Sequence, residues 1–303
     1  MRIGDFEIDD QIEELDNPHC IAILKPWINV GNVGRIVLKR LGMMYASERI
    51  GQLDRPGKFY DFTRYRPRIK LVDGNRLIRT PNTRISVARR HENNDLVLLS
   101  MLEPHAFAED YNDSVVELLK HLGVKRYIQI GGMYDSVPHS RSLPVTGSAR
   151  GWTPPADFGG VKLGTSNYEG PTSMISNISD RLHNDLNVET LSLMVHLPLY
   201  LKLDDDYAGT ARILKILAEL YGFSTRLPEV ELGEKQYEQV SPEMTDNPEL
   251  QDIVQRFERE ADEEAEEDLD FSSGDSISLS PEIEQFLSDV AGSEDEPEAR
   301  DQT

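Results

Sequence analysis

Residues 129–141, which read Gln-Ile-Gly-Gly-Met-Tyr-Asp-Ser-Val-Pro-His-Ser-Arg, decide the fold of this chain. The run that leads into them, 125–130, is short, apolar and rich in β-forming residues, which predicts a buried strand. Two glycines are expected to break that strand, and Pro138 to bend the chain ahead of His139 and Arg141. Open α/β sheets place ligand crevices at such strand ends. A structural turn, whose His and Arg satisfy local carbonyl groups, remains an equal alternative.

Working outward, β-rich runs alternate with helical patterns across residues 19–221, which predicts a sheet with helices on both faces. The predicted strands and extended runs are 19–24, 45–53, 69–72, 76–78, 83–90, 95–101, 125–130, 143–149, 161–163 and 189–197. Helices are expected from residue 33 to 44, over 107–121, from Pro171 to about 184, and over 204–221. Asp73-Gly74-Asn75 is a strong signal for a hairpin between the third and fourth runs.

The charge is distributed very unevenly along the 303 residues. Residues 1–226 hold 28 acidic and 28 basic residues, whereas residues 227–303 hold 26 acidic and four basic ones. We therefore predict a neutral body, 1–226, and an acidic, mostly disordered tail, 227–303. Two short amphipathic helices are expected in the tail, at 247–260 and 281–290. The tail would repel nucleic acid and anionic membranes.

The chain has one cysteine, Cys20, which excludes an internal disulfide framework and fits a reducing cytoplasm. It lies in an apolar run, so a core side chain is favoured over a reactive thiol. The N-terminus has no apolar signal core, and no segment approaches the length that spans a membrane. These features predict a soluble, cytoplasmic protein.

Six landmarks, in order, resemble the bacterial and archaeal branch of the proteasome assembly chaperone 2 family, over residues 19–222. They are 29–34 (Asn-Val-Gly-Asn-Val-Gly), 59–62 (Phe-Tyr-Asp-Phe) with 66–67 (Arg-Pro), 99–104 ending in Glu-Pro, 137–141 (Val-Pro-His-Ser-Arg), 168–172 (Tyr-Glu-Gly-Pro-Thr) and 198–200 (Pro-Leu-Tyr).

The resemblance implies a three-layer α/β/α fold with a central mixed sheet, like that of phosphorylases and hydrolases. It also implies self-association into a homo-oligomer and a protein partner that is proteasome-related or other. We expect no cofactor, since the residues show no metal-ligand or nucleotide-binding pattern. In the eukaryotic namesake of the family the activity is chaperoning of proteasome α-ring assembly. Residues 299–303, Ala-Arg-Asp-Gln-Thr, differ from the hydrophobic-Tyr-X ending with which some such chaperones dock into proteasome pockets.

The candidate pocket residues are polar groups in loops that are expected to meet at one edge of the sheet: Asn32, Glu103, His139, Arg141, Tyr168 and Glu169. Glu103 is a possible general base or ligand for a hydroxyl group, with helix capping as the alternative. His139 and Arg141 form a potential clamp for an anion or carboxylate, since Arg binds such groups with two parallel bonds. The alternative is an internal ion pair of Arg141 with Glu103 or Glu169. Tyr168 and Glu169 could instead just precede a helix.

Around Asn32, glycines 31 and 34 could cradle a phosphate at a helix N-terminus. Close packing of the helix on the sheet is the favoured explanation, because the dinucleotide and Walker patterns are missing. The seven histidines show no metal-ligand spacing, and no Ser-His or Cys-His pair stands out. Two functions follow as hypotheses: a non-enzymatic assembly or interaction module, which we favour, and a hydrolase or phosphorylase-like enzyme that uses Glu103, His139 and Glu169.

Overall fold

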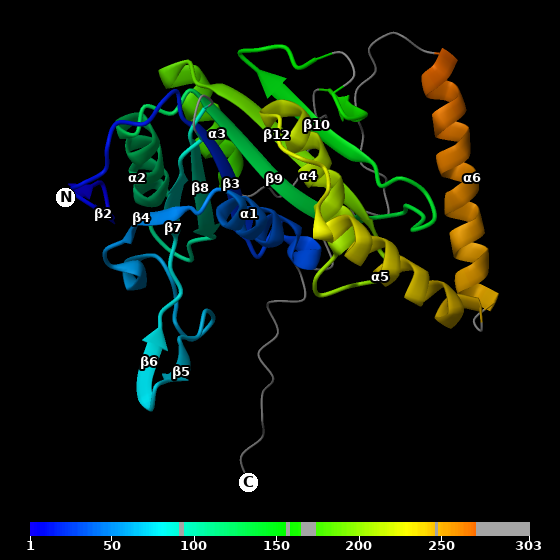
Figure 1. Cartoon of the computed structure of the whole chain (residues 1–303), viewed down its shortest axis with the longest axis horizontal. Helices are drawn as coiled ribbons and strands as arrows, with labels where there is room; N and C mark the ends of the chain where they lie inside the picture. Colours follow the sequence, from blue (N-terminus) through cyan, green and yellow to red (C-terminus); the bar gives the residue numbers. More distant parts are fainter. Residues whose placement is uncertain (91–93, 156–157, 165–173, 246–247, 271–303) are drawn as a thin grey trace.

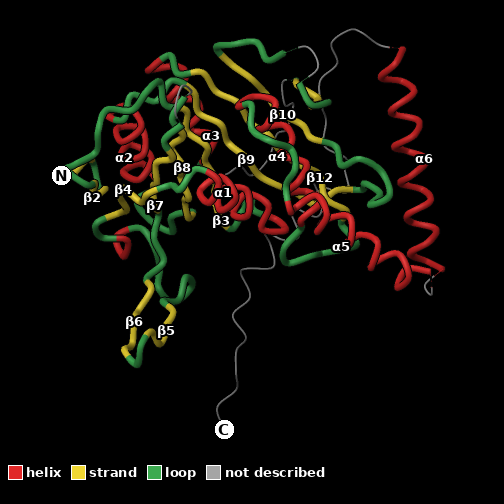
Figure 2. The backbone as a smooth tube through the Cα atoms, viewed as in Figure 1, coloured by secondary structure: helices red, strands yellow, loops and turns green. Residues whose placement is uncertain are grey.

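The computed structural model describes residues 1–90, 94–155, 158–164, 174–245 and 248–270 (Figures 1 and 2). The strands are β1 (Arg2–Ile3), β2 (Phe6–Ile8), β3 (His19–Lys25), β4 (Glu48–Leu53), β5 (Arg68–Val72), β6 (Asn75–Arg79), β7 (Arg84–Ala88), β8 (Leu96–Leu102), β9 (Arg126–Asp135), β10 (Val145–Arg150), β11 (Val161–Leu163) and β12 (Glu189–Pro198). The helices are α1 (Val33–Met44), α2 (Ala108–His121), α3 (Ile175–Leu186), α4 (Tyr207–Tyr221), α5 (Pro228–Thr245) and α6 (Pro248–Asp270), with short 3-10 turns at Val30–Asn32 and Pro56–Lys58.

A ten-stranded mixed sheet lies at the centre, in the order β1-β2-β4-β7-β8-β3-β9-β12-β10-β11. Strands β8, β3, β9 and β12 are parallel neighbours, and antiparallel strands extend the sheet on both sides. β3 and β8 are continuous apolar runs and are almost entirely buried, as expected for parallel strands covered on both faces. The strands β1 and β2 at one edge were not predicted.

Helices cover both faces of the sheet, which confirms the predicted three-layer α/β/α fold. On β3, Cys20, Ala22 and Leu24 point into a core shared with α2 and α3, whereas Ile21 and Ile23 point into a core shared with α1 and α4. This alternation follows from the two-residue period of a strand. We call the two sides the α2/α3 face and the α1/α4 face.

The double glycine of the opening stretch lies inside a strand, which corrects the prediction that it ends one. β9 continues through Gly131 and Gly132 to Asp135 and pairs with β12 along its whole length. A side chain on Gly131 would come within 2.6 Å of the carbonyl oxygen of Ile28, and the amide of Gly132 donates to that oxygen over 2.9 Å. The glycines therefore permit the loop after β3 to cross closely over β9.

Residues 228–245 also differ from the prediction, which placed them in the acidic tail. They form α5, which packs against α4 through the close approach of Gly233 to Ala208 and through the buried side chain of Tyr237. Arg40 of α1 pairs with the buried carboxylate of Glu229 over 2.7 Å. A boundary at residue 226 therefore does not mark the end of the packed body.

The α6 helix confirms the helix predicted at 247–260 and extends it to residue 270. It stands at one end of the molecule, apart from the two helix layers (Figure 1). The second helix predicted in the tail, at 281–290, lies outside the described residues.

The predicted hairpin is present and projects from the body as a separate two-stranded sheet of β5 and β6 (Figure 1). Every residue of both strands is exposed. They include five large apolar side chains: Ile69, Leu71, Val72, Leu77 and Ile78.

Candidate functional site

The loop after β9 is held in place by a tyrosine that follows β12. The backbone amide of His139 donates to the hydroxyl oxygen of Tyr200 over 2.9 Å, and Nδ1 of the same histidine lies 2.8 Å from that oxygen. Burial lowers the pKa of His139, and the nearby Glu258 opposes this shift. Burial also raises the pKa of Tyr200 to about 12, so its hydroxyl group keeps its proton and can donate to Nδ1.

The predicted anion clamp holds carboxylates of the chain itself. The guanidinium of Arg141 binds both carboxylate oxygens of Asp262, at 2.9 and 3.0 Å, and Ser140 donates to Glu258 over 2.5 Å. One turn before Asp262, Phe257 is 3% exposed and stacks on Tyr200. Among the described residues, Arg141 is therefore paired with α6 and not with Glu103; Glu169, the other residue of that alternative, lies outside them.

Beside this clamp is an open cavity of about 240 Å³ between the loop, α4 and α5. The side chains that line the cavity include four basic ones, one acidic one and one tyrosine: His139, Arg141, Arg212, Lys215, Glu234 and Tyr237. Arg212 also donates to the carbonyl oxygens of Leu143 and Gly160, which fixes one wall.

Glu103 lies on the other side of the sheet. It follows β8, and its carboxylate accepts a hydrogen bond from the backbone N–H of Met174, the residue before α3. Burial raises the pKa of Glu103, and the hydrogen bond from Met174 offsets only part of this rise. Met174 belongs to the core of the α2/α3 face, whereas Tyr237, a neighbour of His139, belongs to the core of the α1/α4 face. These contacts divide the predicted cluster, and they give Glu103 the capping role that was its alternative.

Asn32 serves as a tie between two loops. Its side-chain amide donates to the backbone oxygen of Asp204 and to Asp205, both over 2.8 Å, and its oxygen accepts from Asn29. A side chain on Gly34 would approach Ile23 to 2.7 Å, so this glycine permits close packing of α1 on the sheet. Tyr168 and Glu169 lie outside the described residues.

Sequence reasoning missed a hydrogen-bonded relay on the α2/α3 face. Nδ1 of His196, on β12, lies 2.5 Å from Oδ2 of Asp135, at the end of β9. Nε2 of the same ring lies 2.9 Å from the hydroxyl oxygen of Thr146, on β10. The alternation of polar residues along β10 and β12 was the available signal, but only the register of the strands brings the three together.

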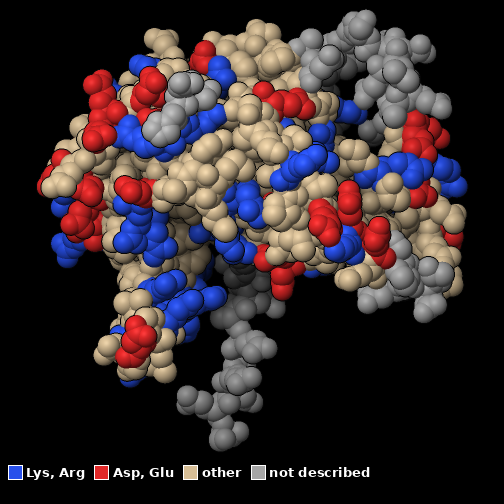
Figure 3. Space-filling model, in the orientation of Figure 1, with Lys and Arg blue, Asp and Glu red and all other residues tan. Residues whose placement is uncertain are grey.

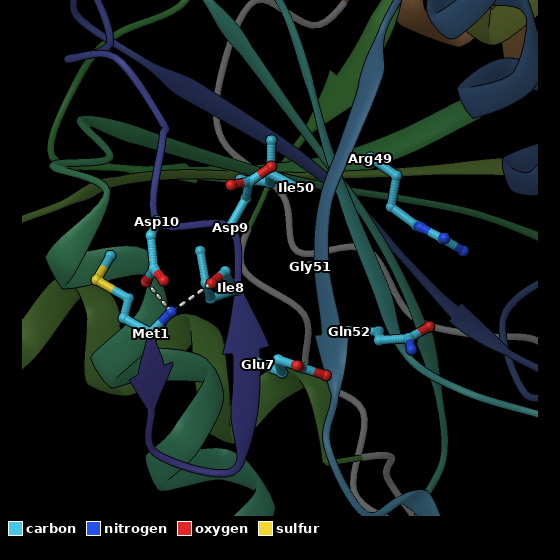
Figure 4. A pocket seen from close by; sticks show the side chains of 9 residues that line it. All are labelled: Met1, Glu7, Ile8, Asp9, Asp10, Arg49, Ile50, Gly51 and Gln52. Atoms are coloured by element: carbon cyan, nitrogen blue, oxygen red, sulfur yellow. Dashed lines mark hydrogen bonds and ion pairs between the residues drawn. The ribbon is translucent and has the colours of Figure 1, made fainter.

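A second hollow, of about 370 Å³, lies along β2 and β4 at the edge of the sheet (Figure 4). Here the N-terminal ammonium of Met1 donates to the backbone oxygen of Ile8 over 2.7 Å and pairs with Asp10. Arg49 and Gln52 point away from that pair (Figure 4). The ammonium group of Met1 is already paired with Asp10, and the side chains of Arg49 and Gln52 do not point toward that pair. The polar groups of this open hollow therefore do not converge on one point where a ligand could bind.

Within the described ranges, no group of three or more His, Cys, Asp or Glu side chains is placed to hold a metal ion. In the same ranges, no helix is both long and apolar enough to cross a bilayer. Cys20 is fully buried, and burial raises the pKa of its thiol, as expected for a core residue.

The central mixed sheet with helices on both faces places the chain among the α/β proteins, the fold class predicted from the sequence. The chain belongs to the PAC2 family, whose family model matches residues 23–245. This confirms the resemblance drawn from the six landmarks.

Solved structures of similar fold come from bacteria and archaea, and three bacterial ones serve as examples. A protein of unknown function from Corynebacterium glutamicum is 21% identical, with a TM-score of 0.75, and the match covers 88% of this chain and 99% of that one. A PAC2 family protein from Streptomyces avermitilis is 25% identical, with a TM-score of 0.67 and coverage of 78% and 99%. A proteasome-assembly chaperone homologue from Mycobacterium tuberculosis is 21% identical, with the same TM-score and coverage. A search of curated proteins found no match.

Proposed function

We propose that this protein is an interaction module that assists the assembly of a protein complex, in the manner of an assembly chaperone. Membership of the PAC2 family supports the proposal, as does the fold shared with a proteasome-assembly chaperone homologue. As part of the same proposal, the protein acts in the cytoplasm and associates with further copies of itself. We further propose that its domain extends through α5, in line with the family match to residue 245.

The observation that carries the proposal is the β5–β6 hairpin. Leu71 is 73% exposed and Ile78 is 63% exposed, in a ribbon whose two faces both meet solvent. An isolated two-stranded ribbon has little stability of its own, and covering each of these side chains would contribute about 2 kcal/mol. A clustered apolar surface of this kind is typical of a protein-interaction site.

The charge of the hairpin indicates the kind of partner. The two strands carry four basic side chains, Arg68, Lys70, Arg76 and Arg79, and the turn between them carries one acidic residue, Asp73. Figure 3 shows basic side chains along the projecting hairpin. A partner surface that is both apolar and acidic would match it, because opposite charges steer association and fix its register.

The test is site-specific photo-cross-linking in the cells that naturally make the protein. A photoreactive amino acid in place of Leu71 should capture defined protein partners. The same amino acid in place of Met43, which is 63% exposed on α1, provides the control at equal exposure. Capture at position 71 that does not exceed capture at position 43 would contradict the proposal.

The alternative, an enzyme that uses Glu103, His139 and Glu169, is less favoured by the two of these residues that the structure describes. Glu103 caps α3, and the loop of His139 binds α6.

A further inference from the structure

The α2/α3 face of β9, β12 and β10 turns polar toward the end of β12. Ser192 and His196 on β12 and Thr146 and Ser148 on β10 occupy alternate positions, and so share this face. Thr146, Ser148 and Ser192 are only half-buried. Hydroxyl groups in a row on a central sheet are unusual, because such positions normally hold core side chains.

Within this row, the hydrogen bonds of His196 fix its tautomer. The ionised carboxylate of Asp135 can only accept hydrogen bonds. Nδ1 of His196 must therefore carry a hydrogen and donate it in this bond. In the neutral ring Nε2 is then an acceptor, and the hydroxyl of Thr146 donates to it over 2.9 Å. A hydroxyl group, a histidine acceptor and a carboxylate that orients the ring form the arrangement that activates a nucleophile.

Burial separates the roles of the three side chains. His196 is 6% exposed, so its ring is held by its two neighbours and is shielded from bulk water. Thr146, in contrast, is half-buried as a residue, so it is the member of the three through which a substrate would reach the relay. Any buried histidine needs both ring nitrogens hydrogen-bonded. What distinguishes His196 is the kind of partner on each side: a carboxylate at Nδ1 and a half-buried hydroxyl group at Nε2, on three adjacent strands.

We propose that Thr146 is a nucleophile toward acyl groups, with His196 as its general base and Asp135 as the residue that positions the ring. The substrate class is a carboxylic ester or a similarly activated acyl compound. Oγ of Thr146 forms a bond to the acyl carbon, its proton moves to Nε2 of His196, and the leaving alcohol departs with that proton. Water then attacks the acyl carbon and gives a proton to Nε2 of His196. The bond between that carbon and Oγ breaks, the proton returns to Oγ to regenerate the hydroxyl group, and the carboxylic acid leaves. This activity is independent of the proposed function.

The experiment uses the full chain and a fluorophosphonate probe. Attack by Thr146 forms the oxygen–phosphorus bond, breaks the phosphorus–fluorine bond, and transfers the hydroxyl proton to His196. Intact mass should rise by one probe adduct, and peptide mapping should place it on Thr146. Thr146→Val should abolish the adduct, and Thr146→Ser should retain it. His196→Gln should slow labelling at least tenfold, in line with the usual contribution of a general base.

Ser148→Ala is the matched control, since Ser148 and Ser192 bond to each other outside the relay. It should label at the wild-type rate. Asp135→Asn should slow labelling and change its pH profile, a readout that a purely structural role would not move. Circular dichroism of each variant checks that it is folded. No adduct on the wild-type chain, an adduct at another residue, or equal labelling of Thr146→Val would overturn the proposal.

Discussion

The two faces of the sheet at β12 and its neighbours are formed by alternate residues of the same strands, and they differ sharply in polarity. On the α1/α4 face, Leu191, Leu193, Val195 and Leu197 are at most 1% exposed and pack under helices. On the other face the alternating side chains are mixed: Met194 packs against the core, whereas Ser192 and His196 are polar, and His196 bonds to both Asp135 and Thr146. The difference shows that one face of this part of the sheet supplies stability, while the other is free to carry chemistry.

The largest effect that this comparison predicts is a loss of stability from the apolar face. Leu193→Ala removes a side chain that is 1% exposed, and should lower the free energy of unfolding by about 3 kcal/mol because it leaves a cavity. Ser192→Ala, one residue away on the polar face, should cost less than about 1 kcal/mol. Urea unfolding measures both. Equal losses would contradict the division of roles.

Next in size is the attachment of α4 and α5, which cover the apolar face. Asp206 is 2% exposed; it caps α4 by accepting from the amide of Gly209, and it also accepts from the hydroxyl of Tyr237 on α5. Asp206→Ala should therefore cost about 2 kcal/mol. The neighbouring Asp205, half-exposed and bonded to Arg35 and Asn32, is the control, and its replacement by Ala should cost less, about 1 kcal/mol. If thermal unfolding showed equal losses, this role of Asp206 would be wrong.

A smaller effect depends on pH. His19 is buried beside Tyr221 on the α1/α4 face, and burial, with help from Arg126 and Arg90, lowers its pKa to about 4. The unfolded chain, with a histidine pKa near 6.5, binds the proton more readily, so stability falls as the pH drops from about 6.5 toward 4. His19→Gln should flatten this fall, whereas the same change at the exposed His121 should not. Urea midpoints at pH 7 and 4.5 decide between them.

The smallest effect concerns α6, which belongs to neither layer. Its contact with Arg141 is exposed and screened by salt, so Arg141→Ala should leave the unfolding midpoint almost unchanged. Hydrogen exchange of the α6 amides should nevertheless become faster, because the helix loses its attachment. Arg256→Ala, which alters an ion pair within α6, should not speed exchange to the same degree. Unchanged exchange in Arg141→Ala would show that the other contacts, Phe257 on Tyr200 and Ser140 with Glu258, are enough to hold the helix.

The sequence predicted those elements whose signal is local. β3 and β8 are unbroken apolar runs, and α2 has a clear helical period, so each was found within one or two residues. Gly131 was misinterpreted because its role depends on Ile28, which contacts it from a loop about a hundred residues earlier. α5 was missed because its acidic, proline-containing sequence resembles a tail, and its burial depends on α4.

For the candidate site, the kind of group that a side chain binds was easier to predict than the residue that provides this group. The sequence identified Arg141 as a carboxylate clamp, and a carboxylate does bind there, but Asp262 lies 121 residues further along the chain. The relay of His196 escaped notice for the same reason, since Asp135 and Thr146 are 61 and 50 residues from it. Pairings of this kind are set by strand register, which composition and periodicity do not encode.

The hairpin also restricts the symmetry of any assembly in which copies of this chain meet through β5 and β6. A two-fold axis through β5 and β6 would bring the four basic side chains of one copy against those of the next, and like charges opposed across paired strands repel. Copies that associate through this ribbon must therefore meet head to tail, with unlike patches in contact, and such contacts close into rings or continue as filaments.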